Sequence, residues 1–184
     1  MIPTKPKSYV RLATLEKTQV KVARAKSEGL IPKTELRSRT LCTTEFSKLA
    51  QYELGLALFE TGKWKDAAPH FEKAAARSPL WADAHFSLAP VYARINRVPE
   101  AMGELDKTLG LNPSHYRANL LCGRLLSLLN KPAEALPNLQ KAATVEPNSI
   151  EAHQFFADTY AQLGRTAKES KERNRAEMLR GIAQ

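Results

Sequence analysis

Small and apolar residues recur along this chain with a period of 34 residues. Two alanine series and one proline series share the spacing; they are Ala50, Ala84, Ala118 and Ala152, then Ala67, Ala101 and Ala135, and finally Pro79, Pro113 and Pro147. Three independent series at one spacing indicate a repeat architecture, in which each repeat is one supersecondary unit.

Each repeat has the pattern of two helices joined by a tight turn. The run Leu54-Gly55, Leu58-Phe59 is apolar at i, i+1 and i+4, which places these residues on one helix face. Such runs end at turn signals, which are Gly62, Asn96, Asn130 and Gly164. A second helical pattern follows and closes at the repeating proline, whose nitrogen cannot donate in a continuing helix. The sequence therefore predicts an all-α fold of helix–turn–helix hairpins.

Small residues recur where the two helices of a hairpin must approach closely. They are Gly55, Ala89, Gly123 and Ala157 on the first helices, and Ala67, Ala101 and Ala135 on the second helices. Large residues such as Phe71 and Leu139 surround them, and this alternation allows helical layers to interdigitate. A single hairpin cannot bury both of its faces, so we expect neighbouring hairpins to stack into a solenoid.

The pattern resembles the signature of the tetratricopeptide repeat. The matching residues are Leu54-Gly55, Leu58, Gly62, Trp64, Ala67, Phe71, Ala74 and Pro79. The resemblance implies repeats at 48–81, 82–115, 116–149 and 150–184, arranged as a right-handed superhelical solenoid of about four hairpins. In the last repeat Glu169 and Arg173 replace the apolar residues of earlier repeats, and such a polar helix suits the end of an array.

The bulk composition is that of a globular protein, with 43% hydrophobic and 26% charged residues in 184. No apolar run approaches the roughly 20 residues that would cross a bilayer. The N-terminus lacks the apolar region of a secretory signal, so the expected location is cytoplasmic.

The first 47 residues carry most of the basic excess. They hold ten Lys or Arg and four Glu, which accounts for six of the nine net positive charges. A helix is possible over 8–27. The segment is interpreted as an arm docked on the first repeat, although a linker of a longer protein remains open. The alternative function is a basic nucleic-acid- or membrane-surface-associated accessory protein acting through residues 5–39, whose binding would weaken steeply between about 50 and about 200 mM salt.

Residues with catalytic chemistry are present but match no known site pattern. The four histidines have no metal-ligand spacing, and His85 and His153 lie two repeat periods apart, which indicates a role in packing. Cys122 lies in an apolar run and is expected in the core, whereas Cys42 is expected to be exposed. The sequence has no nucleophile elbow, phosphate loop or dinucleotide fingerprint. We therefore predict no enzyme activity, no catalytic or metal site and no cofactor.

The resemblance implies that the first helices line a concave groove that binds a protein or peptide. The candidate groove residues carried over from the family are Tyr52, Leu56, Phe59, Glu60, Phe86, Pro90, Arg94, Arg117, Leu120, Arg124, Leu128, Gln154, Asp158 and Gln162. This groove is apolar at one end and cationic in the middle, so its expected partner has an apolar anchor and an acidic group.

Two alternatives to the groove remain at this point. Tyr52, Leu56 and Phe59 pack as ordinary core if the N-terminal segment covers them. The chain could also self-associate through an exposed helix face.

Some tetratricopeptide repeat proteins bind the C-terminal carboxylate of heat-shock chaperones through a clamp of Lys and Asn. Most of the corresponding places in this chain hold other residues, namely Tyr52, Leu56, Asp83 and Ser87. This difference disfavours a co-chaperone role of that kind.

Overall fold

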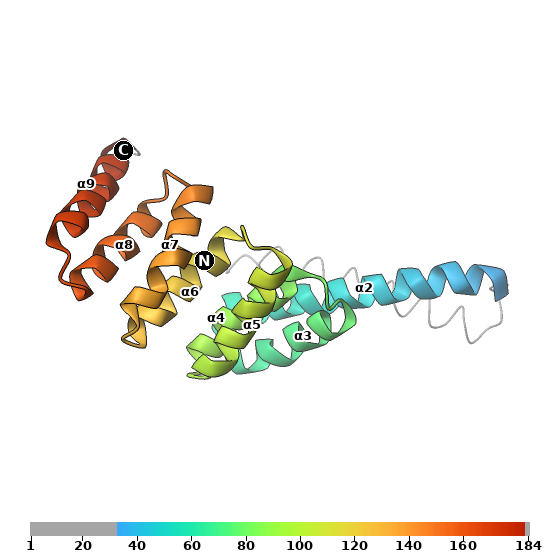
Figure 1. Cartoon of the computed structure of the whole chain (residues 1–184). Coiled ribbons are helices and arrows are strands. Elements are labelled where there is room, and N and C mark those ends of the chain that lie inside the picture. The colour runs from blue at the N-terminus through green and yellow to red at the C-terminus, as the bar shows by residue number, and fades with distance from the viewer. Residues whose placement is uncertain (1–32, 183–184) are drawn as a thin grey trace, which may run out of the picture. The chain divides into compact units, whose positions relative to one another are not determined.

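The computed structural model describes residues 33–182, which form eight α-helices joined by turns (Figure 1). The helices are α2 (Lys33–Glu60), α3 (Trp64–Arg77), α4 (Ala82–Arg94), α5 (Val98–Leu111), α6 (Tyr116–Leu128), α7 (Pro132–Val145), α8 (Ile150–Gln162) and α9 (Thr166–Ile182). The predicted all-α class is confirmed. The helix predicted over 8–27 lies outside the described residues.

The helices keep the period of the sequence. The helices α4, α6 and α8 begin 34 residues apart, and so do α3, α5, α7 and α9. The first helix differs from its counterparts because it begins at Lys33. The expected boundary between residues 47 and 48 therefore lies inside one continuous helix.

A residue with a left-handed backbone lies between the two helices of every repeat. Gly62 and Gly164 have φ angles of 77° and 66°, and Asn96 and Asn130 have φ angles of 62° and 59°. Glycine has no Cβ to clash in this region, and asparagine tolerates it better than most residues do. The turn signals of the sequence are confirmed at all four places.

The chain divides into two compact units, Met1–Arg97 and Val98–Gln184, so the division falls inside the second repeat. In the first unit, α2 and α3 lie side by side as a hairpin and α3 packs against α4 (Figure 1). In the second unit, the pairs α6 with α7 and α8 with α9 form hairpins, and α7 also packs against α8.

The close approach predicted at the small residues is present in both units. A Cβ placed on Gly55 would lie 2.8 Å from the ring of Phe71. A Cβ on Gly123 would lie 2.6 Å from Cγ of Leu139 and 3.4 Å from the carbonyl oxygen of Ala135. Phe71 and Leu139 are fully buried, so neither can move aside into solvent. The second helix thus packs directly on the backbone of the first.

The last helix is polar, as the sequence predicts. Its one buried residue is Ala176. Ser170 and Glu177, both exposed, occupy the positions at which α3 has the buried Ala68 and Ala75. A further hairpin could not bury a carboxylate there without cost, so α9 is suited to meet water.

Replacing Gly123 by alanine tests the close approach. We expect Gly123→Ala to lower the free energy of unfolding by about 1–3 kcal/mol, because the new methyl group must displace Leu139. Gly103→Ala is the matched control, since Gly103 lies inside α5 and a Cβ placed on it would have no atom within 4 Å. The control should raise stability by about 0.5–1 kcal/mol. Urea denaturation followed by circular dichroism measures both, and equal effects would contradict the packing described.

Candidate partner-binding surface

The candidate groove residues lie on the first helices, but they do not share one face. Counting each repeat from residues 48, 82, 116 and 150, the fifth position holds Tyr52, Phe86, Leu120 and Gln154. Phe86 and Leu120 are 8% and 6% exposed, so neither offers much surface to a partner. Gln154 is half-buried.

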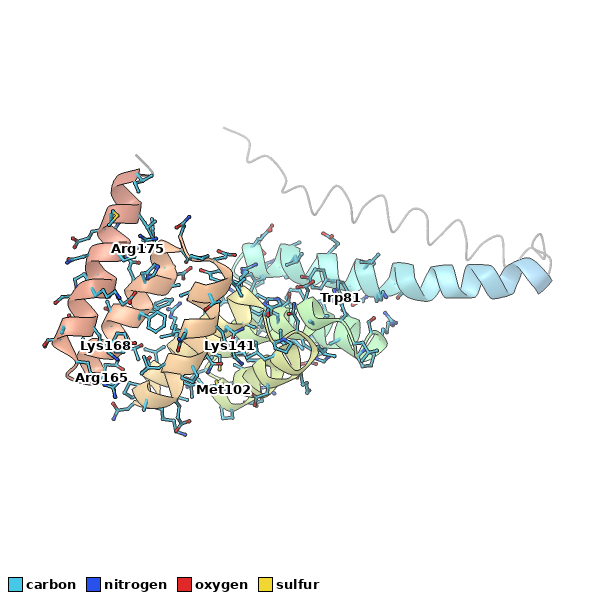
Figure 2. The ribbon with its side chains drawn as sticks, turned by 45° about the horizontal axis from the view of Figure 1, so that its top comes forward. Trp81, Met102, Lys141, Arg165, Lys168 and Arg175 are labelled. Carbon is cyan, nitrogen blue, oxygen red and sulfur yellow. The ribbon has the colours of Figure 1, made fainter. Side chains whose placement is uncertain are left out.

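Tyr52 shows why the fifth position turns inward. Its ring lies 4.6 Å from the ring of Trp81 (labelled in Figure 2) and 5.5 Å from that of Phe71. Its hydroxyl oxygen lies 3.0 Å from the hydroxyl oxygen of Ser87 on α4. The fifth position therefore holds one hairpin against the next within the first unit.

The ninth and thirteenth positions are more accessible. Leu56 and Pro90 are half-buried at the ninth position, whereas Arg124 and Asp158 are exposed there. At the thirteenth position the exposed residues are Glu60, Arg94, Leu128 and Gln162. Phe59, at the twelfth position, is half-buried.

Two of the predicted arginines are held against aromatic rings. The guanidinium of Arg94 lies 5.2 Å from the ring centroid of Trp64, and that of Arg124 lies 5.6 Å from the ring centroid of Phe155. Stacking of this kind uses the flat face of the guanidinium, so the N–H groups at its edge can still donate hydrogen bonds to a carboxylate. Because the ring restrains the side chain, binding would cost less conformational entropy.

The sequence analysis missed Phe155 and Leu121, which both occupy the sixth position of a repeat. Each lies three residues before a predicted residue, Asp158 or Arg124, and therefore on the same helix face. This i, i+3 spacing is the feature of the sequence that could have identified Phe155 and Leu121. The positions carried over from the family include the fifth position, whose side chains pack against neighbouring helices.

Along α6 the exposed and half-buried residues form one continuous surface, which we call the α6 stripe. It consists of Arg117, Leu121, Arg124 and Leu128. The steps of four, three and four residues keep all four within an arc of about 60°. Both arginines are exposed, Leu121 is half-buried, and Leu128 is 72% exposed. The stripe therefore alternates cationic and apolar side chains.

The neighbouring helix α8 packs beside α6. The hydroxyl oxygens of Ser127 and Thr159 lie 3.0 Å apart, which joins α6 to α8. The Asp158 carboxylate lies 3.8 Å from the guanidinium of Arg173 on α9. Arg173 also pairs with Glu169 at 2.9 Å. Asp158 thus has a partner within the α8–α9 hairpin.

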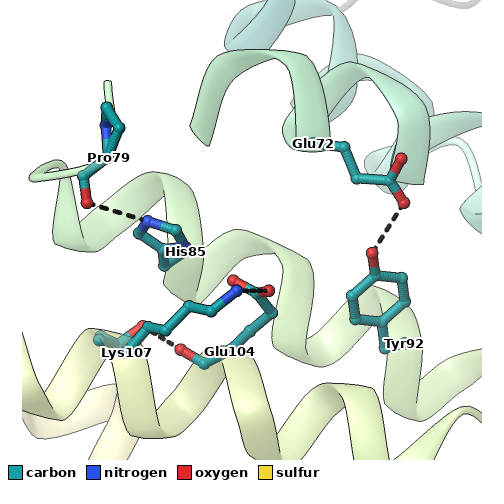
Figure 3. A network of polar contacts seen from close by, with 7 residues as sticks. Glu72, Pro79, His85, Tyr92, Glu104 and Lys107 are labelled. Atoms are coloured by element: carbon teal, nitrogen blue, oxygen red, sulfur yellow. Dashed lines mark hydrogen bonds and ion pairs between the residues drawn. The ribbon is translucent and has the colours of Figure 1, made fainter. Parts of the chain in front are cut away.

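The histidines at the fourth position of a repeat serve packing, as the sequence predicts. His85 Nε2 donates to the carbonyl oxygen of Pro79 at 3.1 Å (Figure 3), and His153 Nε2 donates to that of Pro147 at 3.0 Å. Asn119 fills the same place in the third repeat, and its amide donates to the carbonyl oxygen of Pro113 at 3.0 Å. Each contact ties the end of one repeat to the first helix of the next.

His70, in the first repeat, also has a structural partner. The Nδ1 atom of His70 donates to Oε1 of Gln51 at 2.8 Å, across the α2–α3 hairpin. Burial lowers the pKa of His70 and nearby Lys73 lowers it further, whereas Asp66 raises it. The neutral ring that this favours donates the hydrogen bond in its Nδ1-protonated tautomer.

Within residues 33–182, no group of three or more His, Cys, Asp or Glu could hold a metal ion. None of the helices in this range has the length and apolar character needed to cross a bilayer.

Comparison with known sequences matches the middle of the chain to one family. Residues 52–116 match the family model of the tetratricopeptide repeat. The Hsp70-Hsp90 organizing protein 1 of Glycine max is 25% identical over 99 residues, which cover 54% of this chain and 17% of that protein. Anaphase-promoting complex subunit 7 of Dictyostelium discoideum is 30% identical over 80 residues, covering 44% and 14%. The chain spans less than a fifth of the length of either relative.

Comparison with solved structures covers more of the chain. The crystal structure of MamA matches 79% of this chain and 85% of its own with a TM-score of 0.71 and 18% identity. YrrB, described as a TPR protein with an unusual peptide-binding site, matches 77% of each chain with a TM-score of 0.64 and 21% identity. At these identities the likeness establishes the fold.

Cys122 provides a test of whether the hairpin core holds a reactive group. The side chain is buried, and burial raises the pKa of its thiol to about 11. At pH 8 only about one thiol in a thousand would be the nucleophilic thiolate. In a Cys42→Ser background we expect Ellman's reagent to react at least about a hundredfold more slowly with the native protein than with the unfolded chain. Rapid native reaction would show that the core opens at Cys122.

Proposed function

Because this chain is a tetratricopeptide repeat protein, we propose that it is a non-catalytic scaffold or adaptor that binds a partner protein or peptide. Tetratricopeptide repeats generally mediate protein–protein interaction. The observation that carries the proposal is the α6 stripe, with Arg124 restrained over Phe155 and Leu128 largely exposed. Exposed apolar residues beside oriented cations favour a partner with an apolar anchor and an acidic group.

The first unit carries a proposed binding surface of its own. Leu56, Phe59 and Arg94 lie on α2 and α4, and Arg94 is stacked on Trp64 in the manner of Arg124 on Phe155. We assign Tyr52, Phe86 and Leu120 a supporting role, since packing between hairpins engages Tyr52 and buries the other two. Gln154 and Asp158 border the α6 stripe on α8.

A non-catalytic role is supported by the surroundings of the reactive side chains. The side chains of His70, His85 and His153 make hydrogen bonds within the fold, and burial keeps the Cys122 thiol protonated. A general base or nucleophile needs access to its substrate and a pKa near the working pH. These groups are engaged in packing instead.

The likeness to the Hsp70-Hsp90 organizing protein does not transfer a chaperone partner to this chain. Asp83 would repel a carboxylate at a place where the clamp family has a cation or an amide. Tyr52 and Ser87, at two further places, contact each other. We therefore propose a different partner.

Charge reversal on the α6 stripe tests the proposal. We expect Arg117→Glu combined with Arg124→Glu to abolish capture of the partner, because both carboxylate-binding groups become repulsive. Helicity and melting temperature should change little, since both side chains are exposed. Affinity capture with the wild-type protein and the double variant, read by mass spectrometry, measures the effect.

The matched control is Lys141→Glu combined with Lys171→Glu. These exposed lysines lie on α7 and α9, outside the α6 stripe, and their reversal changes the net charge equally (Lys141 is labelled in Figure 2). Capture should survive in this control. An unaltered capture profile in the arginine variant would remove the α6 stripe from the proposal.

A further inference from the structure

The helix α2 carries a surface that corresponds in position to the α6 stripe. At the second, sixth, ninth and thirteenth positions of its repeat stand Leu49, Glu53, Leu56 and Glu60, which we call the α2 stripe. Leu49 is 45% exposed, Glu60 is exposed, and the other two are half-buried. This stripe alternates apolar and anionic side chains, whereas the α6 stripe alternates cationic and apolar ones.

The two stripes are complementary when their helices run antiparallel. Both have steps of four, three and four residues, and this order reads the same in either direction. The resulting pairs are Leu49 with Leu128, Glu53 with Arg124, Leu56 with Leu121, and Glu60 with Arg117. A parallel alignment would instead place leucines opposite arginines, so the charges select one orientation.

Of the four first helices, α2 alone offers this match to the α6 stripe. In the same antiparallel alignment, α4 would set Arg94 against Arg117, and α8 would set Asp158 against Leu121. Like charges repel, and an acid placed on a leucine loses its hydration without gaining a partner. Complementarity is therefore a property of one helix pair and does not follow from the repeat in general.

We propose that the α6 stripe of one copy binds the α2 stripe of a second copy in antiparallel orientation. The inference rests on the proposed function, because a second copy becomes one partner of the surface already described. The second copy supplies the features expected of that partner, which are apolar anchors at Leu49 and Leu56 and acidic groups at Glu53 and Glu60. Because each copy carries both stripes, the contact either closes into a two-fold dimer or continues from copy to copy.

Sedimentation of the full chain at a series of concentrations tests the inference. The wild-type sedimentation coefficient should rise continuously with concentration. Glu53→Lys combined with Glu60→Lys should weaken association by about tenfold or more, because two attractive pairs become repulsive. Arg117→Glu combined with Arg124→Glu should have the same effect. Mixing these two double variants should restore association, since each then meets an opposite charge.

Two further variants separate the proposed contact from general effects of charge and folding. Leu49→Ser combined with Glu60→Lys alters only exposed positions of the α2 stripe and should also weaken association. Glu146→Lys combined with Glu177→Lys reverses two exposed charges elsewhere and should leave association unchanged. Thermal melts of all variants identify any loss of fold.

The outcomes distinguish this inference from the proposed function. A wild-type chain that sediments as a monomer at every concentration overturns the inference, and so does a mixture that fails to associate. If the α2 variants change only the melting temperature, the α2 stripe is covered within its own chain and the inference is again wrong. In each case, loss of capture by the arginine variant would still support the proposed function. Loss of both would remove the α6 stripe from consideration.

Discussion

The close approach of two helices within a hairpin is the constraint on which the rest of this structure depends. Phe71 and Leu139 pack directly on the backbone at Gly55 and Gly123, where even a methyl group would clash. In these two hairpins the contact fixes the rotation of the first helix about its axis. Once the rotation is fixed, it determines which repeat positions of that helix point toward the neighbouring helices.

That rotation decides which side chains are available for binding. The fifth position turns toward a neighbouring helix, as the contacts of Tyr52 with Trp81 and Ser87 demonstrate in the first unit. On α2 and α6 the second, sixth, ninth and thirteenth positions form a line of exposed and half-buried side chains. The residues on this line differ between the two helices, so α2 presents acids and leucines while α6 presents arginines and leucines. One architecture thus carries surfaces of opposite charge.

Polar residues at the fourth position of a repeat hold successive repeats together by hydrogen bonds. The side chains at the fourth position donate to the carbonyl oxygens of Pro79, Pro113 and Pro147, which lie at the ends of the preceding repeats. A hydrogen bond of this kind typically contributes about 0.5–1.5 kcal/mol to stability. Histidine and asparagine can both supply the donor, which explains why the residue type varies while the contact persists.

The sequence by itself determined the helical class, the 34-residue period, the left-handed turns and the polar last helix. These features depend on local backbone preferences and on small residues at fixed spacing. Both can be recognised in a single amino-acid sequence. Tertiary structure alone decided that α2 begins at Lys33, that Phe86 and Leu120 are buried, and that Phe155 lies beneath Arg124. Adjacent positions on a helix differ by about 100° in direction. Only the packing of neighbouring helices can therefore decide whether the fifth or the sixth position is buried.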